Sequence, residues 1–492
     1  MRSLFSFKAL SMMSCASGGT VVGLFAGFVL YAQFPEDEVL PQQQTVAEIR
    51  KTALERSKRW PKKDQHRMGQ TESESTNPAE NAIKTGLLET ARMPDMSAII
   101  TAKPVLTLDY TPTGSITMIK PKRLTGYRPG LERFHARLAA IDTKRSRRPV
   151  TVLHIGGSHV AADGFSRGIR EDLQARYGDA GRGMVQPAGI TNAGAADQMI
   201  MTIAGDWTKR HAIKDRRGRF GITGMSVSSS STDASMRLTK NNGPFDWASV
   251  TIATGPDQGR VRLRVGTREK IYSAKARRRG SHTFRLDTSG TSLIVEPAGE
   301  GETTVLNWAT GKVRPGIRYV NFGLDGASAD ILHRFNMKLM EKDVLRLNPE
   351  LIIIGYGTQE GFDDKLGISG YRERLDRIVG RLKRWAPKAS LVFIGAASGL
   401  RHGKDGACNG WSLPPKLAPL RRTIKLLASD HGAAYWDWSA AMGGPCAIDA
   451  WARNDLAEAD RKHLTKTGYR RSARLFSSWL MQTENEAVAS NN

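Results

Sequence analysis

The chain has 492 residues, of which 40% are hydrophobic and 25% are charged. This balance predicts two or three folded domains with a sizeable core and excludes a largely disordered protein. Its 73 basic and 48 acidic residues give a formal charge of +25, which favours nucleic acid, acidic glycan or anionic lipid as surroundings. The basic residues are scattered, and zinc-finger spacing and RNP-like aromatic motifs are missing from the sequence, so no nucleic-acid partner is expected.

Residues 1–33 predict a transmembrane helix that serves as a signal anchor. The run 9–33 is uncharged, and roughly 24 helical residues span about 36 Å, enough to cross a bilayer. Basic residues precede the run and acidic residues follow it, so the positive-inside rule places the body outside the cytoplasm. Signal cleavage after Ala32, with secretion, is the alternative. Residues 34–128 predict a polar, largely flexible tether, and 483–492 a flexible tail.

Residues 129–194 predict the first part of an α/β domain. Apolar residues three and four positions apart predict a helix after Gly130, and an apolar strand follows over 150–155. A Gly-Gly-Ser turn then leads into an amphipathic helix over 165–177, which ends at Gly178. This strand–turn–helix unit places Ser158 at the tip of a strand.

Two further regions complete the predicted fold. Short alternating runs separated by turn residues over 195–317 predict an inserted antiparallel β-sandwich. From 318 to 482, apolar strands alternate with helices at 327–347, 371–385, 419–428 and 465–480, with Thr465 as a helix cap. Five such strands predict a parallel sheet covered on both faces, with its active site beyond the carboxyl ends of the strands.

Three residues supply the groups needed for acyl transfer. Ser158 is the candidate nucleophile, but a serine hydroxyl is weak until a base takes its proton. His463 is the candidate base, and Asp460, three residues earlier, is placed to hold the imidazole in the required tautomer. Each motif alone has a structural explanation, since Gly-Gly-Ser turns are common and Asp-x-x-His can be a capping pair.

Three donors are candidates for an oxyanion hole: the backbone N–H of Ser158, the backbone N–H of Gly326 and the side-chain amide of Gln359. Taken singly, Gly326 is a turn residue and Gln359 a surface amide. The catalytic interpretation is favoured because Ser158, Gly326 and Gln359 each follow a strand of the same predicted sheet.

Four segments of the sequence resemble the conserved blocks of the SGNH/GDSL hydrolases. They are HIGGSH, NFGLDGAS, GYGTQE and DRKHLTKTGY, and the resemblance covers about 130–482. The segments GDAGRGM and DWSAAMGG make the chain most similar to bacterial periplasmic peptidoglycan O-acetylesterases that carry an inserted β-sandwich carbohydrate-binding module. The resemblance implies a three-layer αβα, flavodoxin-like domain, with Ser158, Asp460 and His463 as the catalytic triad and Gly326 and Gln359 in the oxyanion hole.

The chain departs from that pattern at two positions. Gly157 stands where the family usually has Asp, a mainly structural residue. Gln359 replaces the usual Asn, and its extra methylene moves the amide by roughly 1.5 Å. Since a misplaced oxyanion donor can cost about 10²–10³ in rate, the loop has adjusted, the hole relies on backbone donors, or activity is low.

Other residues give weaker predictions. Cys408 and Cys446 lie in loops of the exported part and are candidates for a disulfide, with two separate buried thiols as the alternative. Trp411 and Trp451 lie in loops and are candidate substrate-binding residues, whereas Trp436 and Trp438 are expected in the core. No cluster has metal-ligand spacing, so neither a metal nor another cofactor is expected.

The preferred function is a carbohydrate O-acetylesterase that acts on peptidoglycan or an exopolysaccharide through an acyl-enzyme. It is expected in the bacterial periplasm, anchored to the inner membrane by the uncleaved helix. The first alternative is a polysaccharide O-acetyltransferase with the same triad, and the second is a non-catalytic glycan-binding protein of the cell envelope. The sequence leaves the glycan and the oligomeric state open.

Overall fold

A computed structural model describes residues 128–161, 163–188, 199–216, 218–403 and 406–482. It also describes two short paired strands, β1 (Thr107–Asp109) and β2 (Thr117–Ile119), inside the segment predicted as a flexible tether. The predicted membrane helix at 1–33 and the tail 483–492 lie outside the described residues. No helix within the described part is long and apolar enough to cross a membrane.

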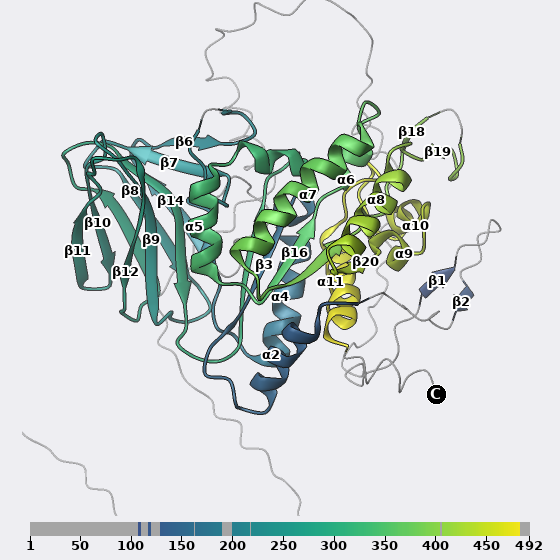
Figure 1. Ribbon diagram of the computed structural model, residues 1–492, viewed down its shortest axis with the longest axis horizontal. Helices are drawn as coiled ribbons and strands as arrows, with labels where there is room; N and C mark the ends of the chain where they lie inside the picture. Colours follow the sequence, from purple (N-terminus) through teal and green to yellow (C-terminus); the bar gives the residue numbers. More distant parts are fainter. Residues whose placement is uncertain are drawn as a thin grey trace, which may run out of the picture. The chain divides into compact units, whose positions relative to one another are not determined.

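A parallel sheet of five strands forms the centre of the α/β part of the fold, in the order β15-β3-β16-β17-β20 (Figure 1). The strands are β3 (Val150–Gly156), β15 (Ile317–Gly323), β16 (Leu351–Gly355), β17 (Ser390–Ile394) and β20 (Ala434–Trp436). All neighbouring pairs run parallel, which confirms the predicted sheet.

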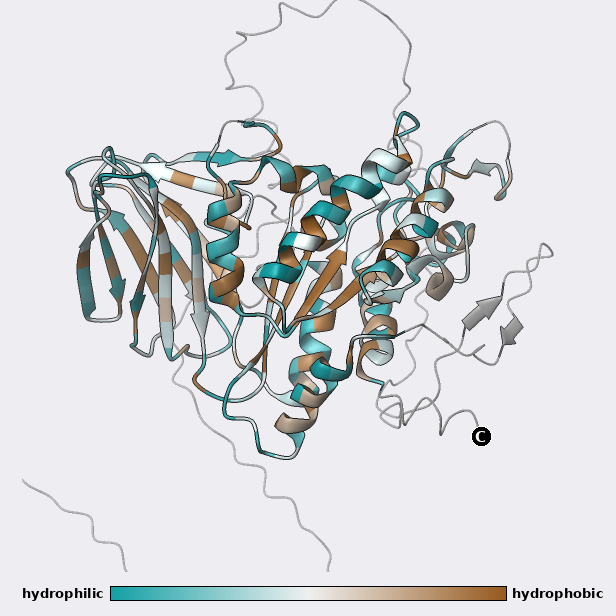
Figure 2. Ribbon diagram, viewed as in Figure 1, coloured by the Kyte–Doolittle hydropathy of each residue, from teal (hydrophilic) through white to brown (hydrophobic). Residues whose placement is uncertain are grey.

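Both faces of this sheet are buried, because alternate residues of each strand point into different cores. In β16, Leu351 and Ile353 belong to one cluster, and Ile352 and Ile354 belong to the other. The first cluster is completed by α2 (Glu132–Asp142), α4 (Gly164–Tyr177), α9 (Trp438–Met442), α10 (Ala447–Arg453) and α11 (Lys466–Met481). The second is completed by α5 (Met337–Leu347), α7 (Ile368–Trp385) and α8 (Leu417–Asp430). Figure 2 shows the central strands brown, as sheet residues covered on both sides should be.

The helix predicted over 327–347 is divided in the structure. A 3-10 helix, η3 (Ala329–Arg334), is followed by an extended break and then by α5. Asn336 causes the restart, since its side chain accepts a hydrogen bond of 3.1 Å from the backbone N–H of Leu339 and caps the new helix. The cap predicted at Thr465 is confirmed, because Thr465 Oγ1 accepts from the N–H of Gly468 at 3.2 Å.

Between β3 and β15 the chain leaves the parallel sheet and builds two antiparallel sheets. One has the order β11-β10-β13-β8-β5, and the other β12-β9-β14-β7-β6 with β4 beside β14. Their strands are β4 (Gly183–Val185), β5 (Met199–Ala204), β6 (Thr208–His211), β7 (Met225–Ser229), β8 (Ser235–Lys240), β9 (Trp247–Thr254), β10 (Arg260–Val265), β11 (Arg268–Ser273), β12 (Gly280–Leu286), β13 (Ser292–Pro297) and β14 (Thr303–Gly311). Both sheets contribute to one hydrophobic core, as in a β-sandwich.

A buried carboxylate connects these antiparallel strands to the α/β part. Asp343 on α5 is 3% exposed, accepts from the N–H of Ile222 at 3.0 Å and accepts from the amide of Asn307 at 3.2 Å. Burial raises the pKa of Asp343.

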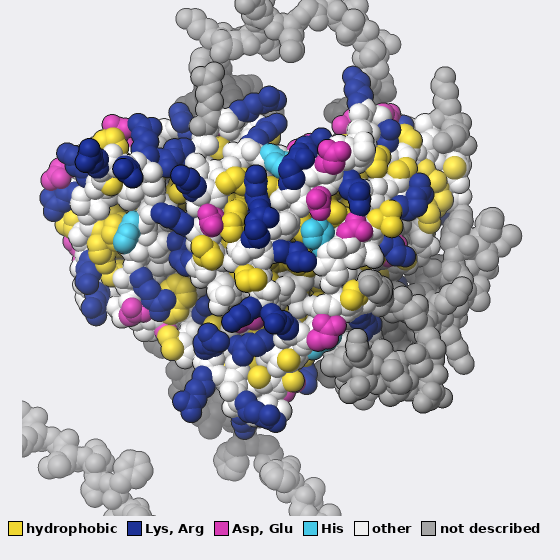
Figure 3. Space-filling view, viewed as in Figure 1, with side chains coloured by type: hydrophobic (Ala, Val, Ile, Leu, Met, Phe, Trp, Pro, Cys, Tyr) yellow, Lys and Arg dark blue, Asp and Glu magenta, His cyan; other side chains and the backbone are white. Residues whose placement is uncertain are grey.

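On the face drawn in Figure 3, basic side chains are dispersed over the surface instead of forming one patch.

Candidate active site

The register of the parallel sheet brings three predicted site residues to one edge. Gly156, the last residue of β3, pairs with Gly323 of β15 on one side and with Gly355 of β16 on the other. The three strands therefore end level with one another. Ser158, Gly326 and Gln359 then follow, two, three and four residues beyond these glycines respectively.

Ser158 begins the short helix α3 (Ser158–Ala161), directly after the strand. Gly157 precedes it at a point where two segments approach closely, because a Cβ atom added there would lie 2.8 Å from the carbonyl oxygen of Ala327. Real Cβ atoms essentially never come this close to a backbone oxygen. The glycine that departs from the family pattern is thus the residue that the observed packing requires.

Asp460 and His463 form a closely bonded pair. Nδ1 of the His463 ring lies 2.6 Å from Asp460 Oδ2, and the other carboxylate oxygen accepts from the backbone N–H groups of Lys462 and His463, each at 2.9 Å. The carboxylate therefore binds both the imidazole and the turn that carries it. This leaves Nε2 of the ring for a second partner.

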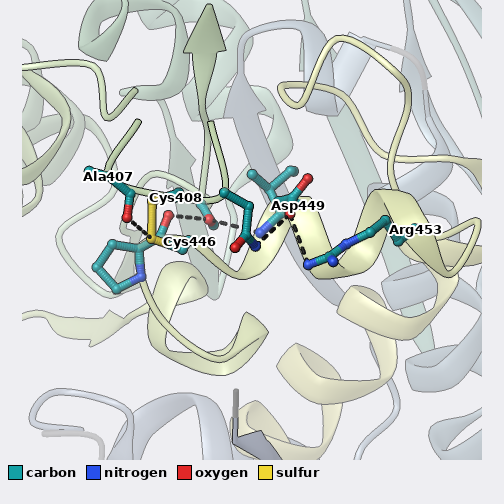
Figure 4. The surroundings of a disulfide bond; sticks show 9 residues. Ala407, Cys408, Cys446, Asp449 and Arg453 are labelled. Carbon is teal, nitrogen blue, oxygen red and sulfur yellow. Dashed lines mark hydrogen bonds and ion pairs between the residues drawn. A yellow bond between two sulfur atoms is a disulfide. The ribbon is translucent and has the colours of Figure 1, made fainter. Parts of the chain in front are cut away.

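The turn that carries the pair is held from several directions. Arg461 adopts a left-handed φ of 51°, and its carbonyl accepts from the N–H of Leu400 at 2.9 Å. A disulfide joins Cys408 to Cys446 at a Cα–Cα distance of 5.4 Å, as drawn in Figure 4. Near it, Asp449 lies 3.4 Å from the Arg461 guanidinium. Leu400, in the loop that carries Cys408, and Asp449, on α10 just after Cys446, thus support the segment beside His463.

Ser158 and His463 line one cavity of about 440 Å³. Its full lining is Ser158, Asp325, Gly326, Gln359, Glu458, His463, Leu464 and Tyr469. Within the described part of the chain, no hydrogen bond joins the Ser158 hydroxyl to the His463 ring. Such bonds are often long in enzymes without ligand and shorten in the reacting complex, so this geometry is compatible with proton transfer.

The charges around the cavity favour an ionised Asp460. Burial raises its pKa, but the hydrogen bonds from His463 and Lys462 outweigh burial and lower it overall. Behind the site, Nδ1 of His159 bonds to the Tyr469 hydroxyl at 2.7 Å. Burial, reinforced by the nearby His463 and Lys462, lowers the pKa of His159 to about 3, so this ring stays neutral and is not a competing base.

A second carboxylate connects the two segments that follow Gly326 and precede Gln359, the candidate oxyanion donors. Gln359 and Glu360 lie on α6 (Thr358–Gly361), which begins just after β16. Glu360 is 3% exposed and accepts from the N–H of Ala329 at 2.7 Å and from the N–H of Gly357 at 3.0 Å. It therefore connects the loop after Gly326 to the start of the helix that bears Gln359.

The protonation of Glu360 should be visible in stability. Burial raises its pKa from the ordinary 4.5 to about 7. Between these two pH values the folded protein keeps a proton that the unfolded chain has lost. The stability that this group contributes is therefore fully present below pH 4.5 and is lost as pH rises towards 7. The full effect is on the order of 3 kcal/mol, at about 1.4 kcal/mol per pKa unit.

The measurement is the unfolding free energy of the wild type and of Glu360→Gln in urea from pH 4.5 to 8. We expect the unfolding free energy of the wild type, relative to that of Glu360→Gln, to fall as pH rises from 4.5 towards 7. The matched control is Glu373→Gln on the exposed face of α7, whose difference from wild type should be constant. A pH-independent difference for Glu360→Gln contradicts the raised pKa.

The two tryptophans predicted to bind substrate are not part of the cavity lining. Trp451 is 3% exposed and donates to the carbonyl of Met442 at 3.0 Å, so its ring packs in the core and is not available as a platform. Trp411, in β19 (Trp411–Ser412), is half-buried between the His402 ring and the Arg461 guanidinium. Trp436 and Trp438 lie in the core, as predicted.

Sequence reasoning missed several residues of the site. Asp325, Glu458 and Tyr469 line the cavity, Glu360 binds the N–H of Ala329 near Gly326, and Lys462 contacts Gln359. All but Glu458 lie inside the segments NFGLDGAS, GYGTQE and DRKHLTKTGY, but these segments do not show which side chains point inward. Among the described residues, no group of three or more His, Cys, Asp or Glu side chains is arranged to hold a metal ion.

One protein-family model matches part of the chain. Residues 294–471 match the GDSL-like Lipase/Acylhydrolase family. The matched range contains Gly326, Gln359, Asp460 and His463, whereas Ser158 precedes it in the sequence, before β4, the first of the inserted antiparallel strands. No curated protein matches the sequence.

Several solved structures are similar to the chain. A peptidoglycan O-acetylesterase is 23% identical, with a TM-score of 0.64 over 74% of this chain and 99% of that one. At this identity, the likeness shows a shared fold. Two others have TM-scores of 0.26: a putative GDSL-like lipase from Parabacteroides merdae, at 18% identity over 34% of this chain and 75% of its own, and a family two carbohydrate esterase from Cellvibrio japonicus, at 12% identity over 57% and 97%.

Proposed function

The chain contains a domain of the GDSL-like lipase/acylhydrolase family and is an ester hydrolase, and from this premise we propose that it is a serine-dependent carbohydrate O-acetylesterase. The observation that carries the proposal is the Asp460–His463 pair, 2.6 Å apart, beside the cavity that Ser158 also lines. A base with an orienting carboxylate and a hydroxyl in one cavity are the parts that acyl transfer needs.

In the proposed reaction, Ser158 Oγ attacks the acetyl carbonyl while His463 Nε2 takes the hydroxyl proton. The negative charge that develops on the carbonyl oxygen is bound by the N–H groups of Ser158 and Gly326 and by the amide of Gln359. His463 then gives its proton to the departing sugar oxygen. Water, deprotonated by the same ring, attacks the acetyl-enzyme, and acetate leaves as Ser158 regains its proton.

The proposed substrate is an acetylated glycan of the bacterial cell envelope, either peptidoglycan or an acidic exopolysaccharide. The fold shared with a peptidoglycan O-acetylesterase and the excess of basic residues support this choice. The Cys408–Cys446 disulfide supports an oxidising compartment, as expected for a periplasmic enzyme held at the inner membrane by residues 1–33.

The test is acetate release by the purified full-length protein from O-acetylated peptidoglycan and from an O-acetylated acidic exopolysaccharide. The same glycans after mild alkaline de-O-acetylation serve as the control and should release nothing. We expect release from at least one acetylated glycan. Hydrolysis of simple esters with no release from either glycan contradicts the carbohydrate assignment, and preferential acetyl transfer to an added oligosaccharide assigns an O-acetyltransferase instead.

A further inference from the structure

Lys462 lies between Asp460 and His463 in the sequence, and its side chain reaches Gln359, which lines the same cavity as His463. Its ammonium donates a hydrogen bond of 2.7 Å to Oε1 of Gln359, which is 103 positions away in the chain. One turn therefore contributes both the candidate base, His463, and a contact to a candidate oxyanion donor.

This contact decides the orientation of the Gln359 amide. A lysine ammonium has three donors and no acceptor, so only the amide oxygen can face it. The amide NH₂ is then on the opposite branch of the side chain. Within the described residues no protein hydrogen bond engages this NH₂, and Gln359 is part of the cavity lining.

Lys462 is itself fixed at both ends. Its backbone N–H donates to Asp460 at 2.9 Å, and its ammonium lies 4.8 Å from the centre of the Phe362 ring. Asp460 and Glu360 both attract its charge, although partial burial outweighs them and lowers the pKa of Lys462. A side chain held in this way can fix the position of the amide that it binds.

On the basis of the proposed function, we infer that Lys462 is a positioning residue that holds Gln359 with its NH₂ towards the developing oxyanion. A charged donor on the amide oxygen also polarises the amide, which makes its N–H groups stronger donors. This contact explains how glutamine serves at a position where related hydrolases usually have asparagine. The longer side chain of Gln359 is held at its amide oxygen by Lys462, in the same turn as His463.

A double-mutant cycle tests the inference with Lys462→Met and Gln359→Ala. We expect Gln359→Ala to lower kcat about 10²–10³-fold and Lys462→Met about 10–10²-fold, with KM changed less than about threefold. Because Lys462 acts through Gln359, the double variant should be no slower than Gln359→Ala alone. Lys462→Arg, which keeps a charged donor, should recover most of the loss. Lys466→Met on the exposed start of α11 is the control and should behave as wild type.

Two readouts separate this inference from the glycan assignment: hydrolysis of 4-nitrophenyl acetate and the rate at which a fluorophosphonate probe phosphonylates Ser158. Neither reagent contains a sugar, so a wrong substrate class leaves both readouts usable. Losses that multiply in the double variant, or an unchanged rate in Lys462→Met, overturn the inference. Absence of phosphonylation in the wild type overturns it together with the serine mechanism.

Discussion

Replacing Ser158 with alanine should abolish ester hydrolysis, with a loss in kcat of about 10⁴-fold or more. The hydroxyl is the group that bonds to the acyl carbon, and the described residues of the cavity offer no second serine, threonine or cysteine in its place. The residual rate should be that of direct attack by water on the ester, helped only by the remaining oxyanion donors. The measurement is kcat on 4-nitrophenyl acetate and acetate release from the acetylated glycan.

The matched control is Ser429→Ala on the exposed side of α8, which should retain wild-type activity. Ser158 is half-buried and its hydroxyl makes no hydrogen bond with other described residues, so alanine should leave the thermal unfolding of the protein nearly unchanged. Hydrolysis retained by a folded Ser158→Ala variant contradicts the role of Ser158 as nucleophile. No hydrolysis and no fluorophosphonate labelling of the wild type identify a non-catalytic glycan-binding protein.

Asp460→Asn should give the second largest effect, with kcat reduced about 10²–10⁴-fold and KM nearly unchanged. The asparagine oxygen can still accept from the backbone of the turn, but its NH₂ faces Nδ1 of His463. That ring nitrogen must then be an acceptor, so Nε2 carries the proton and cannot take one from Ser158. Activity is therefore lost because the His463 ring has the wrong tautomer and no negative charge beside it, while the fold is retained.

The measurement is kcat and KM from pH 5 to 9, with thermal unfolding as the check on folding. Because the pKa of Asp460 is lowered, its carboxylate stays ionised over this range, and the wild-type profile should contain no limb from this group. The control is Asp455→Asn, an exposed carboxylate five residues earlier. A loss as large in Asp455→Asn, or a folded Asp460→Asn variant as fast as wild type, contradicts the orienting role.

The sequence by itself determined the main features of the sheet and its motifs. Continuous apolar strands can be buried only between two layers, so the sequence predicted the parallel sheet and the placement of Ser158, Gly326 and Gln359 just after its strands. The register that aligns Gly156, Gly323 and Gly355 came from the structure. Local side-chain interactions could also be predicted, because the helix cap at Thr465 and the Asp460–His463 pair each join residues three positions apart.

The tertiary structure alone decided which side chains meet across long separations. Glu360 binds the loop of Ala329, Lys462 binds Gln359, and Gly157 is required by the carbonyl of Ala327. None of these partners is visible in a linear pattern, because a residue type fixes what a group can bond to and the fold fixes what lies within reach. For the same reason Trp451, in a sequence position that reads as a loop, is packed in the core.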